Sequence, residues 1–209
     1  MVLSSQVFQF RAELLGSQPL IWRRVQVPGD YTFWDLHVSI QSAFAWNDSH
    51  LHEFKLKSSG MDRCFGLPTD EDEWRDPADR PLPDWEHRVA DYLDAPGQRI
   101  YYCYDFGDDW RHALIFEEAL PAVTGKKYPR CIAGERAAPP DDCGGIHGYA
   151  SLLEILADPQ HEEYKSSHRW AVSMKGLRGK FDPEAFDEQA VKFANPAPRL
   201  KRMLEATGR

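Results

Sequence analysis

Near the start of the chain, apolar and polar residues alternate as they do in a strand that buries one face. Residues 7–14 read Val-Phe-Gln-Phe-Arg-Ala-Glu-Leu and predict a first strand. The apolar run at 20–27 predicts a second strand, and the turn-forming residues 16–19 separate the two. The pattern therefore predicts an antiparallel hairpin.

Across residues 33–45 the apolar positions recur every three or four residues instead, which is the spacing of an amphipathic helix. Thr32 is a suitable N-cap, and Asp35 three positions later completes a near capping box. We expect this helix to pack its apolar side on the sheet.

A second hairpin is predicted in the middle of the chain. Residues 99–104 are rich in strand formers, 106–109 can turn, and 110–116 return as a strand. Residues 50–57 are also expected to be extended. In contrast, residues 68–87 combine four prolines with a dense acidic run and predict a long exposed loop.

The last third of the chain is predicted to be mainly helical, after an irregular stretch rich in Pro and Gly at 121–148. One helix is expected after Gly148 and another through 162–170. A third is expected from Asp182-Pro183, where Asp can cap the helix and Pro can occupy its first turn.

These elements together predict an α+β fold, with an antiparallel β-sheet packed against several amphipathic helices. Residues 1–195 are expected to form a single compact domain, followed by a basic C-terminal tail at 196–209.

The composition is that of a globular protein with a substantial core, since 42% of residues are hydrophobic and 12% aromatic. No apolar run approaches the roughly 18 residues of a membrane span, so no membrane partner is expected. The first residues lack the basic start and apolar centre of a secretion signal, which favours the cytoplasm. There the four widely spaced cysteines are expected to be reduced.

The charge is unevenly distributed along the chain. The net charge is −8, yet residues 165–209 hold ten basic and five acidic side chains. This segment can be an interaction tail that contacts phosphates, or a solvated helical face on an acidic body. The overall negative charge disfavours nucleic acid as the main partner, because binding to a polyanion depends on compensating its phosphates.

The densest group of chemically active residues lies in the predicted second hairpin. Three carboxylates and an imidazole occur within eight residues and can bind a divalent metal or supply a base. The candidate cluster is Asp105, Asp108, Asp109, Trp110 and His112. The competing interpretation is structural, because Asp and Gly are also preferred in tight turns.

A metal site can also form around His50 and His52, which project from the same face if they lie on one strand. Further ligands would come from Asp108 or Asp109 and from His112 if the strands are neighbours. The candidate ligand set is therefore His50, His52, Asp108 and His112, for zinc or manganese. Alternatively, the two histidines are hydrogen-bonded residues beside Phe54.

Cysteines and histidines in the second half of the chain give a weaker zinc pattern: Cys131, Cys143, His147 and His161. Their spacing does not match a compact zinc finger. Cys143-Gly144-Gly145 can also be a thiol nucleophile before a flexible turn. A third interpretation of Pro139-Pro140-Asp141-Asp142 is a rigid lead-in to the following helix, without chemistry.

Several motifs occur in the order found in one known family: Pro19-Leu20-Ile21-Trp22-Arg23-Arg24, Thr32-Phe33-Trp34-Asp35-Leu36-His37, His50-Leu51-His52-Glu53-Phe54, Tyr104 to His112, and Pro139-Pro140-Asp141-Asp142-Cys143-Gly144-Gly145. From about Val7 to about Asp187 the chain resembles the plasmid pRiA4b ORF-3-like family, whose members are often labelled insertion-element passenger or TnpR-like proteins. The resemblance implies an α+β fold with antiparallel sheet and an association with plasmids or mobile elements, but no catalytic residues.

Two departures from the family's labels and motifs matter. Some relatives are labelled resolvases, but this sequence lacks the serine nucleophile, arginine cluster and basic helix-turn-helix tail of a serine recombinase. Family members commonly carry Cys where this chain has Ala138, which weakens a zinc role for Cys131 and Cys143.

Three functional hypotheses follow. The favoured one is a non-enzymatic binding or accessory protein for a protein or small-ligand partner. It would use an aromatic groove rimmed by the acidic loop 70–86 and lined by Trp22, Trp34, Trp46, Tyr104 and Trp110. The second is a metal-dependent hydrolase or nuclease that uses the His/Asp cluster. The third is a nucleic-acid binder that uses the basic C-terminal segment.

Overall fold

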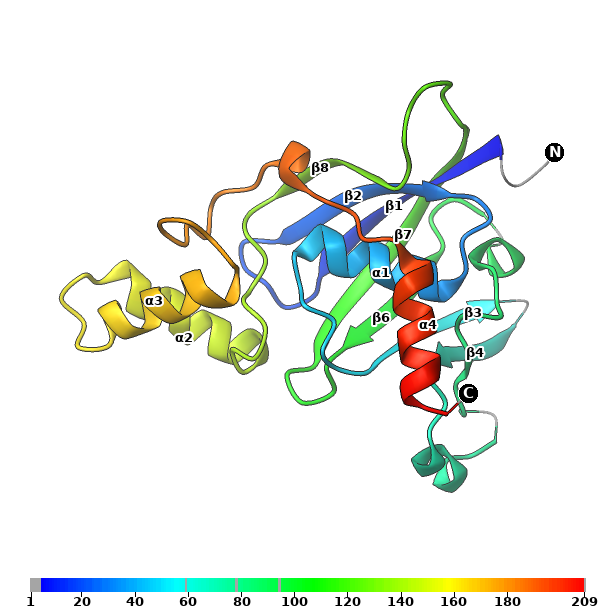
Figure 1. Cartoon of the computed structure of the whole chain (residues 1–209), viewed down its shortest axis with the longest axis horizontal. Helices are drawn as coiled ribbons and strands as arrows, with labels where there is room; N and C mark the ends of the chain where they lie inside the picture. The colour runs from blue at the N-terminus through cyan, green and yellow to red at the C-terminus, as the bar shows by residue number, and fades with distance from the viewer. Residues whose placement is uncertain (1–4, 59, 78, 94, 209) are drawn as a thin grey trace.

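One mainly antiparallel sheet organises the chain, as seen in the computed structural model, which describes residues 5–58, 60–77, 79–93 and 95–208 (Figure 1). Its eight strands run in the order β5-β4-β3-β6-β7-β1-β2-β8, and β4 and β5 form the one parallel pair among them. The strands are β1 (Gln6–Leu14), β2 (Ile21–Pro28), β3 (His52–Ser58), β4 (Met61–Gly66), β5 (Leu82–Pro83), β6 (Arg99–Tyr104), β7 (Trp110–Pro121) and β8 (Arg130–Glu135).

Helix α1 (Phe33–Phe44) covers one face of this sheet. It begins with the expected capping box, in which the Thr32 hydroxyl accepts from the Asp35 amide and the Asp35 carboxylate accepts from the Thr32 amide. Phe33, Leu36 and Ile40 are almost completely buried against inward-facing strand residues. Burial of this apolar side accounts for the position of α1, because an isolated helix of 12 residues is marginal in water.

The remaining helices lie around this body. Helices α2 (Gly145–Ala157) and α3 (Tyr164–Met174) pack together and project from one end of the sheet (Figure 1). Helix α4 (Pro196–Ala206) packs on α1 and begins with an Asn195 cap and Pro196 in its first turn. Short 3₁₀ turns occupy Asp70–Trp74, Val89–Tyr92 and Glu188–Ala190. None of the helices in the described residues has the length and apolar composition that a bilayer span requires.

The α+β prediction is confirmed, as are both hairpins and the helix over 33–45. The predicted helix at Asp182-Pro183 is wrong, because this segment remains irregular up to the 3₁₀ turn at Glu188–Ala190. Here the Phe186 ring packs 3.7 Å from the Arg23 guanidinium, and the Ala137 amide donates to the Pro183 carbonyl. These tertiary contacts replace the local hydrogen bonds of a helix.

Two further expectations need correction. The stretch 121–148 is not wholly irregular, since β8 extends the sheet as an edge strand beside β2. The loop 68–87 is not exposed throughout, because Asp84 is fully buried and accepts a hydrogen bond from the backbone of Trp34 through its carbonyl. Both features depend on distant partners that the local sequence pattern does not reveal.

Candidate metal centre

Three loops meet at one end of the sheet. They are the segment 45–51 after α1, the turn 105–109 between β6 and β7, and the segment 136–144 before α2. The Asp105 amide donates to the Leu51 carbonyl at 2.9 Å, and the Gly144 amide donates to the Asp108 carboxylate at 3.1 Å. These bonds hold the three loops in fixed positions.

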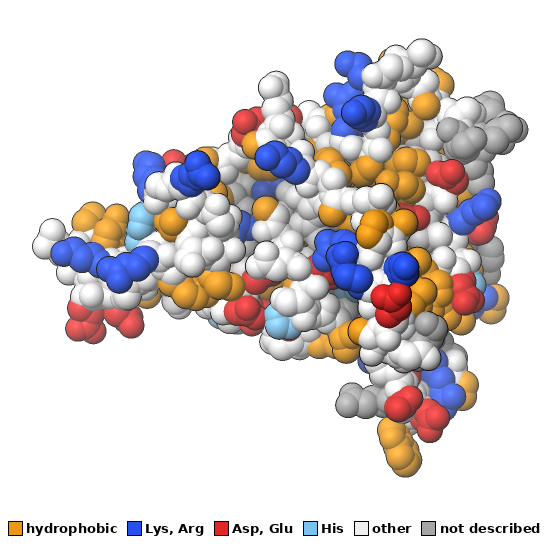
Figure 2. All heavy atoms as spheres, viewed as in Figure 1, with side chains coloured by type: hydrophobic (Ala, Val, Ile, Leu, Met, Phe, Trp, Pro, Cys, Tyr) orange, Lys and Arg blue, Asp and Glu red, His pale blue; other side chains and the backbone are white. Residues whose placement is uncertain are grey.

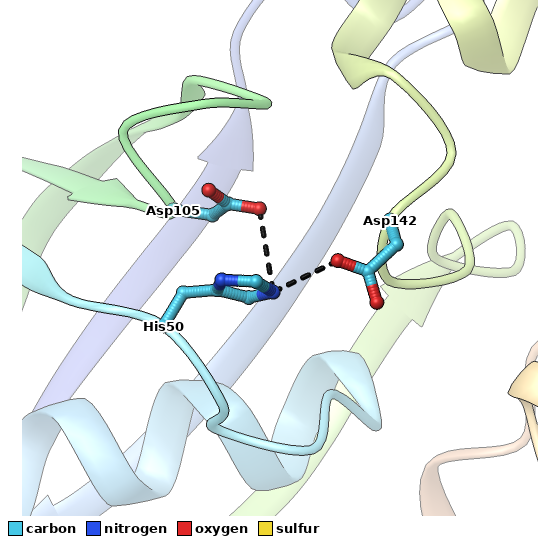
Figure 3. Close-up of side chains that lie close together, drawn as sticks. All are labelled: His50, Asp105 and Asp142. Atoms are coloured by element: carbon cyan, nitrogen blue, oxygen red, sulfur yellow. Dashed lines mark hydrogen bonds and ion pairs between the residues drawn. The ribbon is translucent and has the colours of Figure 1, made fainter.

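Each loop contributes one ligand-type side chain to a single point (Figure 3). His50 Nε2 lies 2.9 Å from Asp142 Oδ1 and 3.6 Å from Asp105 Oδ2. One ligand atom from each of the three residues lies within 4.8 Å of the others. The side chains of Asp105, His50 and Asp142 are 11%, 33% and 55% exposed, so the group is anchored on one side and open to solvent on the other.

Both aspartates adopt the left-handed backbone conformation, with φ of 56° at Asp105 and 58° at Asp142. Asp tolerates this region better than most residues because its short side chain can hydrogen-bond locally. Asp105 does so through Oδ1, which accepts from the Gly107 amide at 2.9 Å, while Oδ2 faces His50. One oxygen therefore closes the turn and the other remains available to a ligand.

The close approach of the loops depends on a glycine. A side-chain Cβ at Gly145 would lie 2.3 Å from the Asp108 carbonyl oxygen, which is too short for any residue with a side chain. Gly145 also has a φ of 67°. Gly145 thus allows the segment that carries Asp142 to approach the β6–β7 turn closely.

An imidazole and two carboxylates form a donor set that suits manganese, zinc or ferrous iron. Metal–ligand distances of about 2.1 Å place neighbouring ligand atoms roughly 3.0–3.4 Å apart. The observed separations of 2.9 and 3.6 Å bracket that range. The residues present therefore fit a divalent cation, with coordination positions left on the exposed side.

The structure does not bring together the predicted ligand set of His50, His52, Asp108 and His112. The His52 ring stacks on His37 and its Nε2 contacts Asp84 at 2.7 Å. His112 is fully buried on β7, where Nδ1 contacts the Trp110 carbonyl at 3.1 Å. His50 alone of the four belongs to the three-residue group found in the described chain.

The turn residues Asp105, Asp108, Asp109, Trp110 and His112 divide between different roles. Asp105 faces His50, while Asp108 holds the Gly144 amide. Asp109 pairs with Arg111 at 2.7 Å on the surface, and Trp110 is completely buried. The candidate ligand that the sequence patterns do not single out is Asp142, which they place in a lead-in to α2. The sequence does contain a signal for Asp142, because it lies just before Gly144-Gly145 in one of the motifs that resemble the family.

The second zinc pattern and the reactive thiol find no support in the geometry. Among the described residues, Cys131, Cys143, His147 and His161 form no group with ligand atoms in mutual reach. Cys131 is buried in β8, where its thiol contacts the Ala133 carbonyl. Burial raises the pKa of Cys143 to about 12, so this thiol is protonated and a poor nucleophile at neutral pH.

The expected aromatic groove is absent from the described surface. Trp34 and Trp46 are 5% exposed, and Tyr104 and Trp110 are fully buried. Trp22 lies on the other face of the sheet, where the Arg11 guanidinium sits 4.2 Å from its ring. The rings therefore form core and sheet-face contacts instead of a shared groove.

A hollow of about 430 Å³ adjoins the candidate metal centre and includes His50 in its wall. A buried polar network connects to this hollow through Asp48. His37 Nε2 contacts Asp48 at 2.7 Å, its Nδ1 contacts the Tyr102 hydroxyl at 2.9 Å, and Asp48 in turn pairs with Arg199 of α4. Burial lowers the pKa of His37 to about 4, so its imidazole is neutral at physiological pH.

Comparison with known proteins gives consistent matches along the chain. Residues 6–190 match the family described as plasmid pRiA4b ORF-3-like protein. The uncharacterised protein y4hQ of Sinorhizobium fredii (strain NBRC 101917 / NGR234) is 33% identical over 200 residues, which cover 93% of this chain and 98% of that protein. The crystal structure of MM3350, a protein of unknown function from Methanosarcina mazei Go1, matches with a TM-score of 0.77 and 38% identity. That match covers 90% of this chain and 98% of the MM3350 chain.

Proposed function

Since the chain belongs to the plasmid pRiA4b ORF-3-like family and these relatives are described as uncharacterised or of unknown function, we propose a function from its own site geometry. The proposed function is that of a divalent-metal-dependent hydrolase of phosphoesters, with His50, Asp105 and Asp142 as metal ligands. The observation that carries the proposal is the convergence of these three side chains from three separate loops.

The alternative of a non-enzymatic binding protein relied on an exposed aromatic groove. Four of its five rings are buried, so the hydrolase hypothesis now has the stronger physical support. Association with plasmids or mobile elements and a cytoplasmic location remain predictions.

Each residue of the proposed centre has a separate role in holding the cation. Asp105 and Asp142 supply two negative charges that offset a divalent cation, and His50 supplies a neutral nitrogen donor. When bound, such a cation lowers the pKa of a coordinated water and neutralises charge that develops on a phosphoryl oxygen. The exposed side of Asp142 and His50 leaves access for that water and for substrate.

The reaction would be hydrolysis. An oxygen of water forms a bond to phosphorus, the bond from phosphorus to the ester oxygen breaks, and the leaving oxygen takes up a proton. The products are an alcohol and a phosphate carrying one ester group fewer, so no oxidant or further reactant is needed.

The test begins with elemental analysis by plasma mass spectrometry of the purified, untagged protein before and after chelator dialysis. The wild type is expected to hold close to one manganese, zinc or iron per chain, and the His50→Ala and Asp142→Asn variants are expected to hold much less. His147→Ala is the matched control, because His147 is an exposed histidine on α2 outside the centre.

The metal-loaded protein is then assayed with p-nitrophenyl phosphate and bis(p-nitrophenyl) phosphate. Turnover that disappears in His50→Ala and persists in His147→Ala supports the proposal. A folded wild type that takes up no divalent metal, or variants that retain metal as well as the wild type, would overturn it.

A further inference from the structure

The hollow beside His50 has an apolar wall and a basic wall, and Asp48 and His52 also line it. The apolar wall is formed by side chains from four separate segments: Trp34, Leu51, Leu67 and Met203. The basic wall comes from Arg199 and Arg202 of α4. Figure 2 shows Lys and Arg side chains grouped on the surface over this helix.

Helix α4 is fixed in place, so its arginines are presented in a defined position. The Trp34 indole donates to the Pro196 carbonyl at 3.2 Å, and the Arg199 guanidinium pairs with Asp48. The Asp48 carboxylate is itself held by the buried His37. Arg199 is therefore a positioning residue, with its charge already compensated.

Arg202 differs from Arg199 because its side chain is exposed and belongs to no ion pair within the described part of the chain. Within the wall of the hollow, Arg199 is paired with Asp48, so Arg202 adds a positive charge that no carboxylate of the wall compensates through an ion pair. A divalent cation held by His50, Asp105 and Asp142 would add positive charge beside the hollow, so an anion bound between that cation and Arg202 would be attracted from both sides.

From this arrangement, and resting on the function proposed above, we infer that the hollow binds a small phosphate ester that carries an apolar group. The phosphate lies between the metal centre and Arg202, whose planar guanidinium can hold two phosphate oxygens. The apolar group packs against Leu51, Leu67 and Met203. The volume of about 430 Å³ is in the range of small-molecule sites, which run from roughly 300 to 1,000 Å³.

A small ester fits this chain better than a nucleic acid strand. The net charge of −8 disfavours contact with a long polyanion, and Arg202, the unpaired arginine in the described lining of the hollow, supplies only one of the many phosphate contacts that strand binding uses.

The experiment uses the full chain loaded with Mn²⁺ and three probes: inorganic phosphate, phenyl phosphate and a single-stranded oligonucleotide. Binding of Mn²⁺ is measured by electron paramagnetic resonance. Binding of the first two probes is measured by the paramagnetic broadening of their ³¹P signals, and all three are titrated by calorimetry.

Phenyl phosphate is expected to bind more tightly than inorganic phosphate because it also buries its ring. Arg202→Ala should weaken the binding of phenyl phosphate and of inorganic phosphate by about tenfold, because it removes a charge-assisted hydrogen-bond partner of the phosphate. The affinity for Mn²⁺ should stay unchanged. Lys201→Ala is the matched control, because it removes a positive charge from the same helix outside the hollow. Leu51→Ser should weaken phenyl phosphate but not inorganic phosphate.

Failure of this inference is distinguishable from failure of the metal centre. Normal Mn²⁺ binding with phosphate affinity unchanged in Arg202→Ala would overturn the subsite and leave the centre intact. Absence of Mn²⁺ binding in the wild type would overturn both. An oligonucleotide that binds more tightly than phenyl phosphate with the same dependence on Arg202 would overturn the assignment to a small ester.

Discussion

The imidazole rings of His37 and His52 lie face to face in the interior, with centroids 3.5 Å apart and planes within 5° of parallel. Each ring has its own carboxylate, Asp48 for His37 and Asp84 for His52. Burial and the neighbouring His52 ring both lower the pKa of His37.

Two buried histidines, His37 and His112, predict that acid lowers the stability of the fold. Burial lowers the pKa of His37 to about 4 and that of His112 to about 3, both from 6.5. Because the folded-state values are the lower ones, the unfolded chain binds these protons first as the pH falls below 6.5. The full contribution to stability is present above pH 6.5 and is lost as the pH falls toward 4. At pH 5 each histidine should lower the unfolding free energy by about 2 kcal/mol relative to its value above pH 6.5.

Urea unfolding at pH 7.5 and pH 5.0 measures this loss. His112→Phe provides the comparison, because it keeps a ring between Phe44 and Trp46 and removes one titrating group whose Nε2 has no partner within the described structure. The variant should lose less free energy between the two pH values than the wild type. Equal losses in both proteins would show that His112 does not titrate on unfolding.

These histidines also show where sequence reasoning reaches its limit. The helix at 33–44 could be predicted because its cap and its apolar spacing are local. The role of His52 could not, since it depends on Asp84, which lies 32 residues later in a stretch with the composition of an exposed loop. The candidate site shows the same contrast. Asp105 could be predicted because it lies in a local turn with a dense group of carboxylates. The contact between Asp142 and His50 could not, because the two residues are 92 positions apart in the sequence and meet only when their loops pack together.

A second prediction concerns two adjacent arginines on β2. Arg23 is buried and donates to four backbone carbonyls, those of Trp22, Ala43, Glu135 and Arg136. Burial lowers its pKa to about 10, so it remains charged. Arg23→Lys should lower the unfolding free energy by about 2–3 kcal/mol, because an ammonium cannot reach all four acceptors.

Arg24 is the matched control, since it points to the other face of the sheet and pairs with Glu117 at 2.7 Å near the surface. Arg24→Lys should cost less than about 1 kcal/mol. Denaturant unfolding of both variants at pH 7.5 checks the contrast. Similar losses at the two positions would mean that the buried carbonyl contacts do not determine the stability of this region.

A third prediction tests the close approach of two loops at the metal centre. Gly145→Ala should weaken Mn²⁺ affinity, because its Cβ would collide with the Asp108 carbonyl oxygen and displace the segment that carries Asp142. Gly97→Ala is the control, since Gly97 also has positive φ, 92°, but no atom within 4 Å of the added Cβ. The control should cost about 1–2 kcal/mol of stability and leave Mn²⁺ affinity unchanged. Metal titration followed by electron paramagnetic resonance distinguishes the two.

The last prediction decides whether Asp105 is a metal ligand or only a turn residue. Asp105→Asn keeps a side chain that tolerates φ of 56° and an oxygen that can accept from the Gly107 amide, but it removes the negative charge. Its unfolding free energy should fall by no more than about 1 kcal/mol, because Asp105 is buried but the amide oxygen keeps the hydrogen bond from Gly107.

Its metal affinity should nevertheless fall by at least about tenfold, since a neutral amide is a poorer ligand for a divalent cation than a carboxylate. Asp109→Asn is an unusually close control. Asp109 lies in the same turn, also has a φ of 56°, and directs its carboxylate to Arg111 instead of His50. Calorimetric titration with Mn²⁺ and Zn²⁺ should separate the two variants. If Asp105→Asn binds metal as tightly as Asp109→Asn, the Asp105 carboxylate serves the hairpin turn alone, and the centre must be reassigned to other ligands.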